Sequence, residues 1–151
     1  MVLPLVGDAH NSMEQSMKLY VECEAREGYL YVKALGRFEH AAAREVFHAW
    51  VEEAHRNELD RILCDVTRVE GIELEQLSIM DRFDIMAYVS SKLPSGFRLA
   101  ILALPQQQSK DKFEENVMVN RGAQVRVTGD PEEAFKWLGI EALAKAVNHG
   151  R

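Results

Sequence analysis

The sequence is poor in several features that would assign it to a function class. Only two of its 151 residues are cysteines, Cys23 and Cys64, and both lie in apolar segments, so we expect free buried thiols. Basic residues are outnumbered, with 18 Lys and Arg against 24 Asp and Glu, which gives a net charge of −6. Because binding of nucleic acid needs clustered positive charge, the composition argues against a nucleic-acid partner.

Long hydrophobic runs are also missing. The longest later apolar run, residues 99–104, has the length of a strand, whereas a helix needs about 20 apolar residues to cross a bilayer. The apolar opening contains Pro4, has no basic flank and stops at Gly7, so it is too short for a signal peptide. We therefore predict a cytoplasmic protein with no transmembrane segment.

Common catalytic motifs are absent as well. No glycine-rich phosphate loop follows an apolar run, no serine lies in a G-x-S-x-G turn, and neither cysteine has the surroundings of a nucleophile. The best set of metal ligands is His48, Glu52 and His55, on one face of an expected helix. That face lies opposite the apolar stripe, so we interpret it as a solvated polar face. The sequence predicts a non-enzymatic protein with no metal and no cofactor.

Hydrophobic periodicity indicates alternating strands and helices. Period-two alternation predicts a hairpin, and further short apolar or alternating runs predict three more strands, together at residues 19–25, 30–34, 62–64, 97–104 and 124–128. Spacings of three and four predict helices over residues 39–57, 73–92, 109–122 and 130–139, with a stripe that continues toward the C-terminus. The strongest local signal is Asp130-Pro131 followed by Glu133, which is typical of a helix start.

This order predicts one α/β domain. We expect a single-layer mixed, mostly parallel five-stranded sheet flanked by helices, because strands joined by helical crossovers run parallel. The domain spans residues 17–151 and follows an N-terminal arm, residues 1–16. Clean alternation of polar and apolar residues places the strand at 124–128 at an edge of the sheet.

Polar residues follow two of the expected parallel strands, where ligands of such sheets usually bind. They are Asp65, Thr67 and Arg68 after one strand, and Gln106, Gln107 and Gln108 after the next. Asp65 could instead hydrogen-bond the turn that follows it, and we favour that structural role. Arg121 could bind an anion or simply stabilise a helix C-terminus.

Several segments, in their order along the chain, resemble the STAS superfamily and in particular its SpoIIAA-like branch, also described as STAS/SEC14 domains. The resemblance covers about residues 17–139. It rests on Phe38-Glu39-His40, the strand and turn at residues 62–69, the strand at 99–102, Asn120-Arg121-Gly122, and Asp130-Pro131-Glu132-Glu133-Ala134 with Trp137-Leu138. It implies a STAS-like fold and a non-enzymatic role that depends on docking to partner proteins.

Anti-sigma-factor antagonists of this superfamily carry a phosphorylatable serine at the start of the second helix. Their pattern begins here as Asp65-Val66-Thr67-Arg68-Val69, but Leu74 and Glu75 fill the two hydroxyl positions. We therefore expect no phosphorylation switch of that type. Glu75 could imitate the phosphorylated state, although an acidic residue in a first helical turn is already explained by the helix dipole.

The helix expected over residues 73–92 has apolar residues on two faces. The stripe that suits the sheet contains Ile79, Phe83, Met86, Val89 and Leu93. The second stripe contains Leu74, Leu77, Ile85 and Tyr88, with Asp81 and Asp84 beside it. Two apolar faces need two contacts, and a homodimer is the expected one because a twofold axis presents the same patch twice. Core packing, the arm, a ligand or a partner protein could cover the stripe instead.

Two function hypotheses follow. The first is a regulatory or protein-interaction domain, and the second is a SEC14-like carrier or sensor of a lipid or other apolar small molecule. For either hypothesis, the candidate ligand or partner surface comprises Leu74, Leu77, Ile85, Tyr88, Asp65, Thr67, Arg68 and Arg121.

Overall fold

The computed structural model describes residues 2–3, 18–72, 79–108 and 112–140. Its sheet contains the five expected strands: β2 (Tyr20–Arg26), β3 (Tyr29–Arg37), β4 (Arg61–Asp65), β6 (Arg98–Leu102) and β7 (Gln124–Thr128). Two strands of two residues each, β1 (Val2–Leu3) and β5 (Val69–Glu70), extend the sheet beyond the prediction. The α-helices are α1 (His40–Arg56), α2 (Ile79–Lys92), α3 (Phe113–Asn120) and α4 (Pro131–Leu138).

The pairing of the strands confirms the mixed, mostly parallel sheet. The strand order is β1-β2-β3-β4-β6-β7, with β5 paired to the end of β3. The hairpin β2–β3 is antiparallel and turns at Gly28, where a φ of 89° favours glycine. The steps β3–β4, β4–β6 and β6–β7 are parallel. Strand β7 lies at the edge, as its alternation predicts, and Glu115 Oε1 accepts a hydrogen bond from the Val127 N–H at 2.7 Å.

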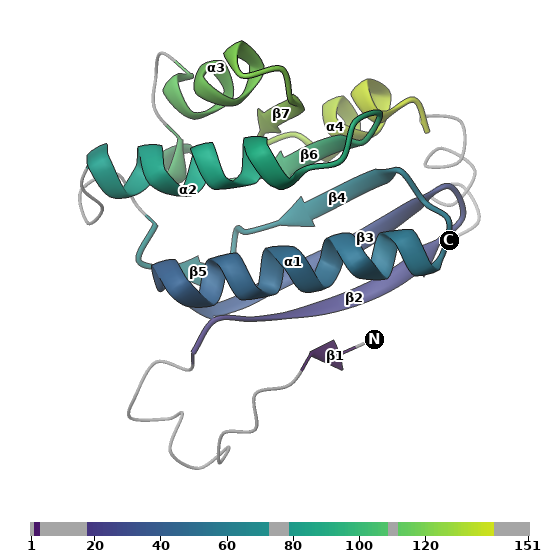
Figure 1. Ribbon diagram of the computed structural model, residues 1–151, viewed down its shortest axis with the longest axis horizontal. Coiled ribbons are helices and arrows are strands. Elements are labelled where there is room, and N and C mark those ends of the chain that lie inside the picture. The colour runs from purple at the N-terminus through teal and green to yellow at the C-terminus, as the bar shows by residue number, and fades with distance from the viewer. Residues whose placement is uncertain (1, 4–17, 73–78, 109–111, 141–151) are drawn as a thin grey trace.

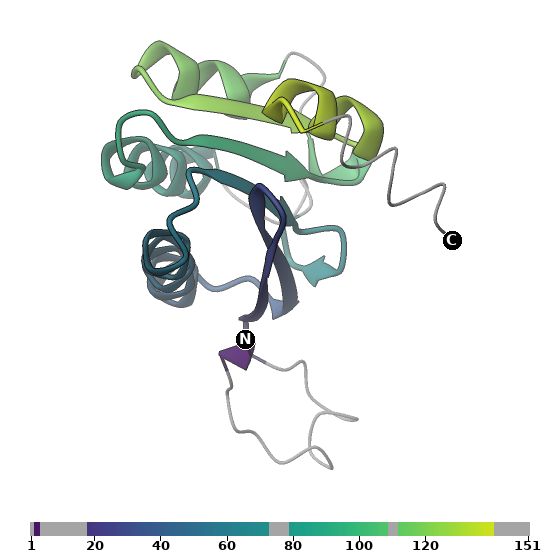
Figure 2. The same ribbon diagram turned by 90° about the vertical axis from the view of Figure 1, so that its right-hand side faces the viewer.

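Helices cover the sheet on both faces (Figures 1 and 2). Helices α1, α2 and α3 lie on one face, and α4 lies on the other. The alternation along β4 divides the core accordingly, since Ile62 and Cys64 pack toward α1 and α2 while Leu63 packs toward α4. In this core, Ile62, Leu63, Leu99, Phe47 and Trp50 are buried, and Ile101 is partly buried.

Helix α4 begins and ends where the sequence predicts. The Asp130 carboxylate accepts a hydrogen bond from the Glu132 N–H at 3.0 Å, and Pro131 occupies the first turn. Gly139 ends the helix with a φ of 82°. Two arginines of the sheet reach the last carbonyls: Arg61 Nε donates to Leu138 O and Arg98 Nη1 donates to Trp137 O, at 2.5 and 3.2 Å.

The remaining helix boundaries agree in part with the predictions. Helix α1 lies within the expected range, and α2 ends at Lys92 as predicted. Helix α3 begins at Phe113, after Lys112 in the left-handed region with a φ of 57°, rather than soon after Ser109. Ser109, the start of the helix expected at residue 73, and the stripe beyond Ile140 lie outside the described residues.

Candidate functional site

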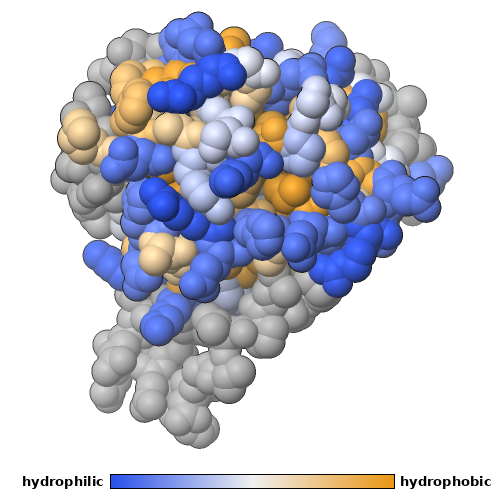
Figure 3. Space-filling model, viewed as in Figure 1, coloured by the Kyte–Doolittle hydropathy of each residue, from blue (hydrophilic) through white to orange (hydrophobic). Residues whose placement is uncertain are grey.

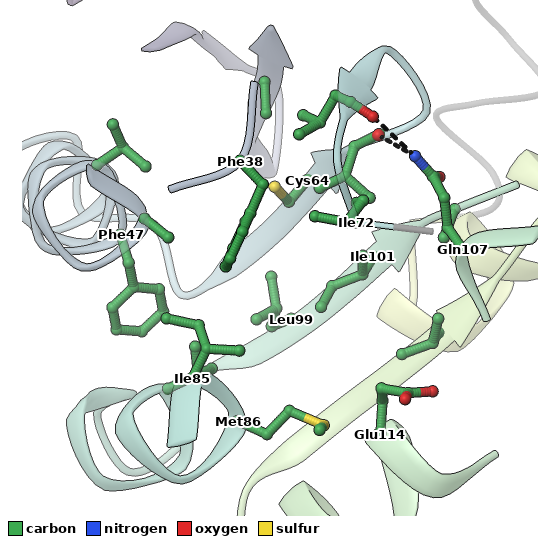
Figure 4. A pocket seen from close by; sticks show the side chains of 18 of the residues that line it. Phe38, Phe47, Cys64, Ile72, Ile85, Met86, Leu99, Ile101, Gln107 and Glu114 are labelled. Carbon is green, nitrogen blue, oxygen red and sulfur yellow. Dashed lines mark hydrogen bonds between the residues drawn. The ribbon is translucent and has the colours of Figure 1, made fainter. Parts of the chain in front are cut away.

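A cavity of about 220 Å³ lies between the sheet and the helices α1, α2 and α3. Figure 4 shows Phe38 and Ile85 approaching it from opposite sides, with Leu99 and Ile101 supplied by β6. The apolar lining is drawn from both layers and includes Val21, Phe47, Val66, Ile72, Met86, Val89, Met118 and Val127. Such a lining favours an apolar occupant, because few groups in it can hydrogen-bond.

Among the described residues that line the cavity, Arg82 and Glu114 are the charged ones. Arg82 Nη2 of α2 donates a hydrogen bond to Glu114 Oε2 of α3, and the two side chains are 15% and 19% exposed. The Arg82 guanidinium carbon also lies 5.3 Å from the centre of the Phe113 ring. This ion pair ties the two helices together at the side of the cavity that α3 borders.

Gln107 joins the loops that follow β4 and β6. Its Nε2 donates to the carbonyls of Val66 and Val69, at 3.0 and 3.2 Å, and its Oε1 accepts from the Leu104 N–H at 2.8 Å. The two bonds that Nε2 donates are drawn in Figure 4. Gln107 is buried, whereas Gln106 is exposed and Gln108 donates to Ala103 O. The buried Gln107 side chain thus holds together the two loops at the carboxyl ends of β4 and β6.

Asp65 takes the structural role that the sequence favours. Its Oδ1 accepts hydrogen bonds from the backbone N–H and the hydroxyl of Thr67, at 2.9 and 2.6 Å, which closes the turn after β4. The Tyr31 hydroxyl donates to Oδ2 at 3.5 Å, and burial with the nearby Asp65 charge raises the pKa of Tyr31. Arg68 is exposed. Asp65 and Thr67 therefore hold the turn, and neither lines the cavity.

In the second stripe of α2, core packing covers the residues that the structure describes, which is one of the alternatives that the sequence left open. Ile85 and Tyr88 are partly buried and pack against the core, where the Tyr88 ring lies 6.0 Å from that of Phe47. Phe83, expected to face the sheet, is 37% exposed. The rest of the stripe that contains Phe83 is confirmed where its side chains are described, since Met86 is buried and Val89 and Leu93 pack against the core. The helix thus directs residues of both stripes inward, because periodicity alone does not fix how far each stripe is buried. Leu74 and Leu77 lie outside the described residues.

Exposed apolar side chains gather instead on α2 and α3. Met80 and Phe83 of α2 are 65% and 37% exposed, and Val119 of α3 is 48% exposed. The guanidinium carbon of Arg121 lies 5.3 Å from the centre of the Phe83 ring. Figure 3 shows apolar surface at the upper left, where Figure 1 places α3 and the start of α2. We call Met80, Phe83, Val119 and Arg121 the α2–α3 surface.

The other reactive groups have structural partners. His48 Nε2 lies 3.1 Å from Glu52 Oε1 on the exposed face of α1, and the His55 ring lies 5.2 Å from that of Phe97. Within the described ranges, no group of three His, Cys, Asp or Glu side chains could hold a metal ion. Both cysteines are buried. Burial raises the pKa of Cys23 to about 11 and also raises that of Cys64, so neither thiol is activated.

Comparisons with known proteins address the fold. No protein-family model matches the sequence, and no curated protein matches it. The structure is similar to an anti-sigma factor antagonist from Mycobacterium paratuberculosis, with 14% identity and a TM-score of 0.53 over 81% of this chain and 95% of that chain. The chain has a STAS/SpoIIAA-like fold. The resemblance noted in the sequence is thus confirmed for the fold of this STAS-like domain.

A second similar structure is an uncharacterized protein of the DUF3478 family with a SpoIIAA-like fold, from Shewanella loihica PV-4. It has 21% identity and a TM-score of 0.45 over 80% of this chain and 93% of that chain. In the part of the STAS-like domain that the structure describes, none of the helices has the length and hydrophobicity to cross a membrane.

Sequence reasoning missed the cavity and its charged pair. Arg82 and Glu114 belong to different helices, and nothing in the spacing of residues links them. Arg82 carries one weak signal, since Ile85 and Met86 follow it at the helical spacings of three and four residues and place it beside an apolar stripe. Gln107 was among the candidates, but its buried hydrogen bonds to two carbonyls follow only from how the loops meet.

Proposed function

We propose that this STAS-like domain is a non-enzymatic regulatory module that docks to a partner protein through the α2–α3 surface. The observation that carries the proposal is the exposure of Met80, Phe83 and Val119 on two adjacent helices. Exposed apolar side chains that lie together favour burial against another protein, because each square ångström removed from water stabilises the complex by about 25 cal/mol. The similarity of fold to an anti-sigma factor antagonist supports a protein partner.

Site-specific photo-crosslinking in cells of the source organism tests this proposal. A benzophenone side chain in place of Phe83 should give one discrete adduct, whereas the same group in place of the exposed Lys136 on α4 should not. Substitution of Met80 by Glu should reduce the yield at position 83. An adduct to a second copy of the chain would mean that the predicted homodimer uses this surface. No adduct, or the same adducts at both positions, would overturn the proposal.

A second candidate function is binding of a small apolar molecule, and the cavity favours it. About 220 Å³ of space is lined by side chains from the sheet and from three helices. Native mass spectrometry of freshly purified protein, followed by a denatured spectrum, should show a small molecule that is lost on unfolding. The variant Ile101→Phe, which places a larger ring in the cavity, should carry less of it. The melting temperature of the wild-type protein is also measured with added apolar compounds. If the native mass equals that of the chain alone and no compound raises the melting temperature, this candidate is contradicted.

A further inference from the structure

The side chains of the cavity differ in their capacity to bind a polar group. Gln107 already uses its amide on two carbonyls and its oxygen on the Leu104 N–H. Burial raises the pKa of the Cys64 thiol, which makes it a poor partner for an ion. A guanidinium has five N–H donors in a planar fork, and Glu114 accepts from the Nη2 of Arg82. Arg82 can therefore present further donors to a second acceptor.

The fork geometry of arginine suits a carboxylate in particular. A guanidinium binds a carboxylate through two parallel N–H donors, and this arrangement strengthens as water is excluded. Arg82 is 15% exposed and lies against the Phe113 ring, so its orientation is restricted and it is largely screened from solvent. From this geometry, we propose that the cavity binds a small monocarboxylic acid whose carboxylate is held by Arg82 and whose apolar tail lies among Met86, Leu99 and Ile101. This inference rests on the second candidate function.

The volume limits the length of the tail. An apolar cavity of roughly 150 Å³ holds benzene, so a cavity of about 220 Å³ has room for about nine non-hydrogen atoms. Octanoate, which has eight carbons and two oxygens, is close to the upper limit of this space when its head group lies at Arg82. Because Glu114 occupies part of the guanidinium fork, the ligand carboxylate competes with it and is repelled by it. The proposal therefore makes different predictions for the two members of the ion pair.

The first experiment compares head groups on the wild-type protein. Isothermal titration calorimetry is carried out with octanoate, 1-octanol and octylamine, which share one tail. Because hydrogen bonds to charged groups are stronger than neutral ones, octanoate should bind about tenfold more tightly than 1-octanol. Equal affinity of octanoate and 1-octanol, or preference for octylamine, would overturn the carboxylate proposal and leave apolar binding in place. If none of the three binds, the second candidate function fails as well.

The second experiment uses variants whose effects have opposite signs. Arg82→Met should lower the affinity for octanoate to that for 1-octanol, whereas Glu114→Gln should raise it about threefold or more, because the competing charge is removed. Both variants break the ion pair, so a merely structural role would shift octanoate affinity in the same direction in both. Such a common shift would contradict the proposal. The matched control is Arg56→Met, an exposed arginine at the end of α1 that does not line the cavity, which should leave the affinity unchanged.

Circular dichroism melts of each variant report whether it is folded. If Arg82→Met does not fold, Arg82→Lys retains the positive charge and should keep a reduced preference for octanoate. Loss of all preference in a folded Arg82→Lys variant, together with no gain in Glu114→Gln, would count against the assignment of Arg82.

Discussion

The two faces of the sheet differ in how firmly their helices are held. On one face, α4 has a side-chain cap at its start, a left-handed glycine at its end and two arginines on its last carbonyls. Its core contains Leu63, Ala134 and Leu138, each at most 1% exposed. On the other face, α1, α2 and α3 surround a cavity of about 220 Å³. The helix on the first face is fixed by local signals at both ends, whereas the second face carries the cavity and the candidate sites.

This difference indicates which face of the sheet has room for a ligand or partner. A helix held at both ends and packed on a dense core has little freedom to change its contacts. The cavity face carries the larger of the two hydrophobic cores, and the Arg82–Glu114 pair and the bonds of Gln107 add long-range links between its helices and loops. A ligand that enters the cavity occupies space that the side chains of this core leave unfilled.

The largest expected effect is on core packing. Leu138→Ala should lower the free energy of unfolding by about 3–5 kcal/mol, whereas Ile85→Ala should lower it by about 1–2 kcal/mol. Leu138 is fully buried on the α4 face, and Ile85 lines a cavity where some contacts are already missing. Urea unfolding of both variants measures the difference. Equal losses would mean that the two faces are packed alike.

A smaller effect is expected at Gln107. Gln107→Ala leaves the buried carbonyls of Val66 and Val69 without their amide donor, which should cost about 1–3 kcal/mol of stability. The exposed neighbour provides the control, since Gln106→Ala should change stability by less than about 0.5 kcal/mol. If both alanine variants melt at the wild-type temperature, the loops of the cavity face are held by other contacts.

The cap of α4 offers a test on the opposite face. Asp130→Ala removes the acceptor of the Glu132 N–H and should cost about 1 kcal/mol, while Asp130→Asn retains a cap and should stay close to wild type. Thermal unfolding by circular dichroism is sufficient for this comparison. A loss as large in the asparagine variant would show that the negative charge, rather than the cap hydrogen bond, stabilises the helix.

The smallest effect is expected on the outer side of α2. Met80→Ala should change the free energy of unfolding by less than about 0.5 kcal/mol, because Met80 is 65% exposed. Met86→Ala on the same helix should cost clearly more, since Met86 is 5% exposed and lines the cavity. Denaturant titrations of the two alanine variants test which side of α2 packs against the core. Similar losses for both would mean that Met80 is covered in solution.

Much of the architecture could be predicted from local patterns. The alternation at residues 124–128 indicated an edge strand, and β7 is one. Asp130, Pro131 and Gly139 indicated the bounds of α4, and the backbone angles agree with them. Asp65 closes its turn as the residue type favours. These features depend on a few neighbouring residues, so the information needed to recognise them lies within one short segment.

The site could be predicted only in part. The sequence indicated that α2 has two apolar faces, but it assigned Phe83 to the sheet and Ile85 to the surface, whereas Ile85 lines the cavity and Phe83 is exposed. Helical periodicity locates stripes around a helix, but it does not say which stripe meets the sheet. That choice depends on how the side chains of α2 fit those of α1, α3 and the strands.

The sequence by itself determined the order of strands and helices, the acidic balance and the caps of α4, because periodicity, charge and backbone preference are properties of neighbouring residues. Only the tertiary structure decided that Arg82 meets Glu114, that Gln107 binds the carbonyls of Val66 and Val69, and that a cavity remains beneath α2. Each of these features joins segments far apart in the chain. Their geometry is set by how whole helices and strands pack, and no single segment encodes it.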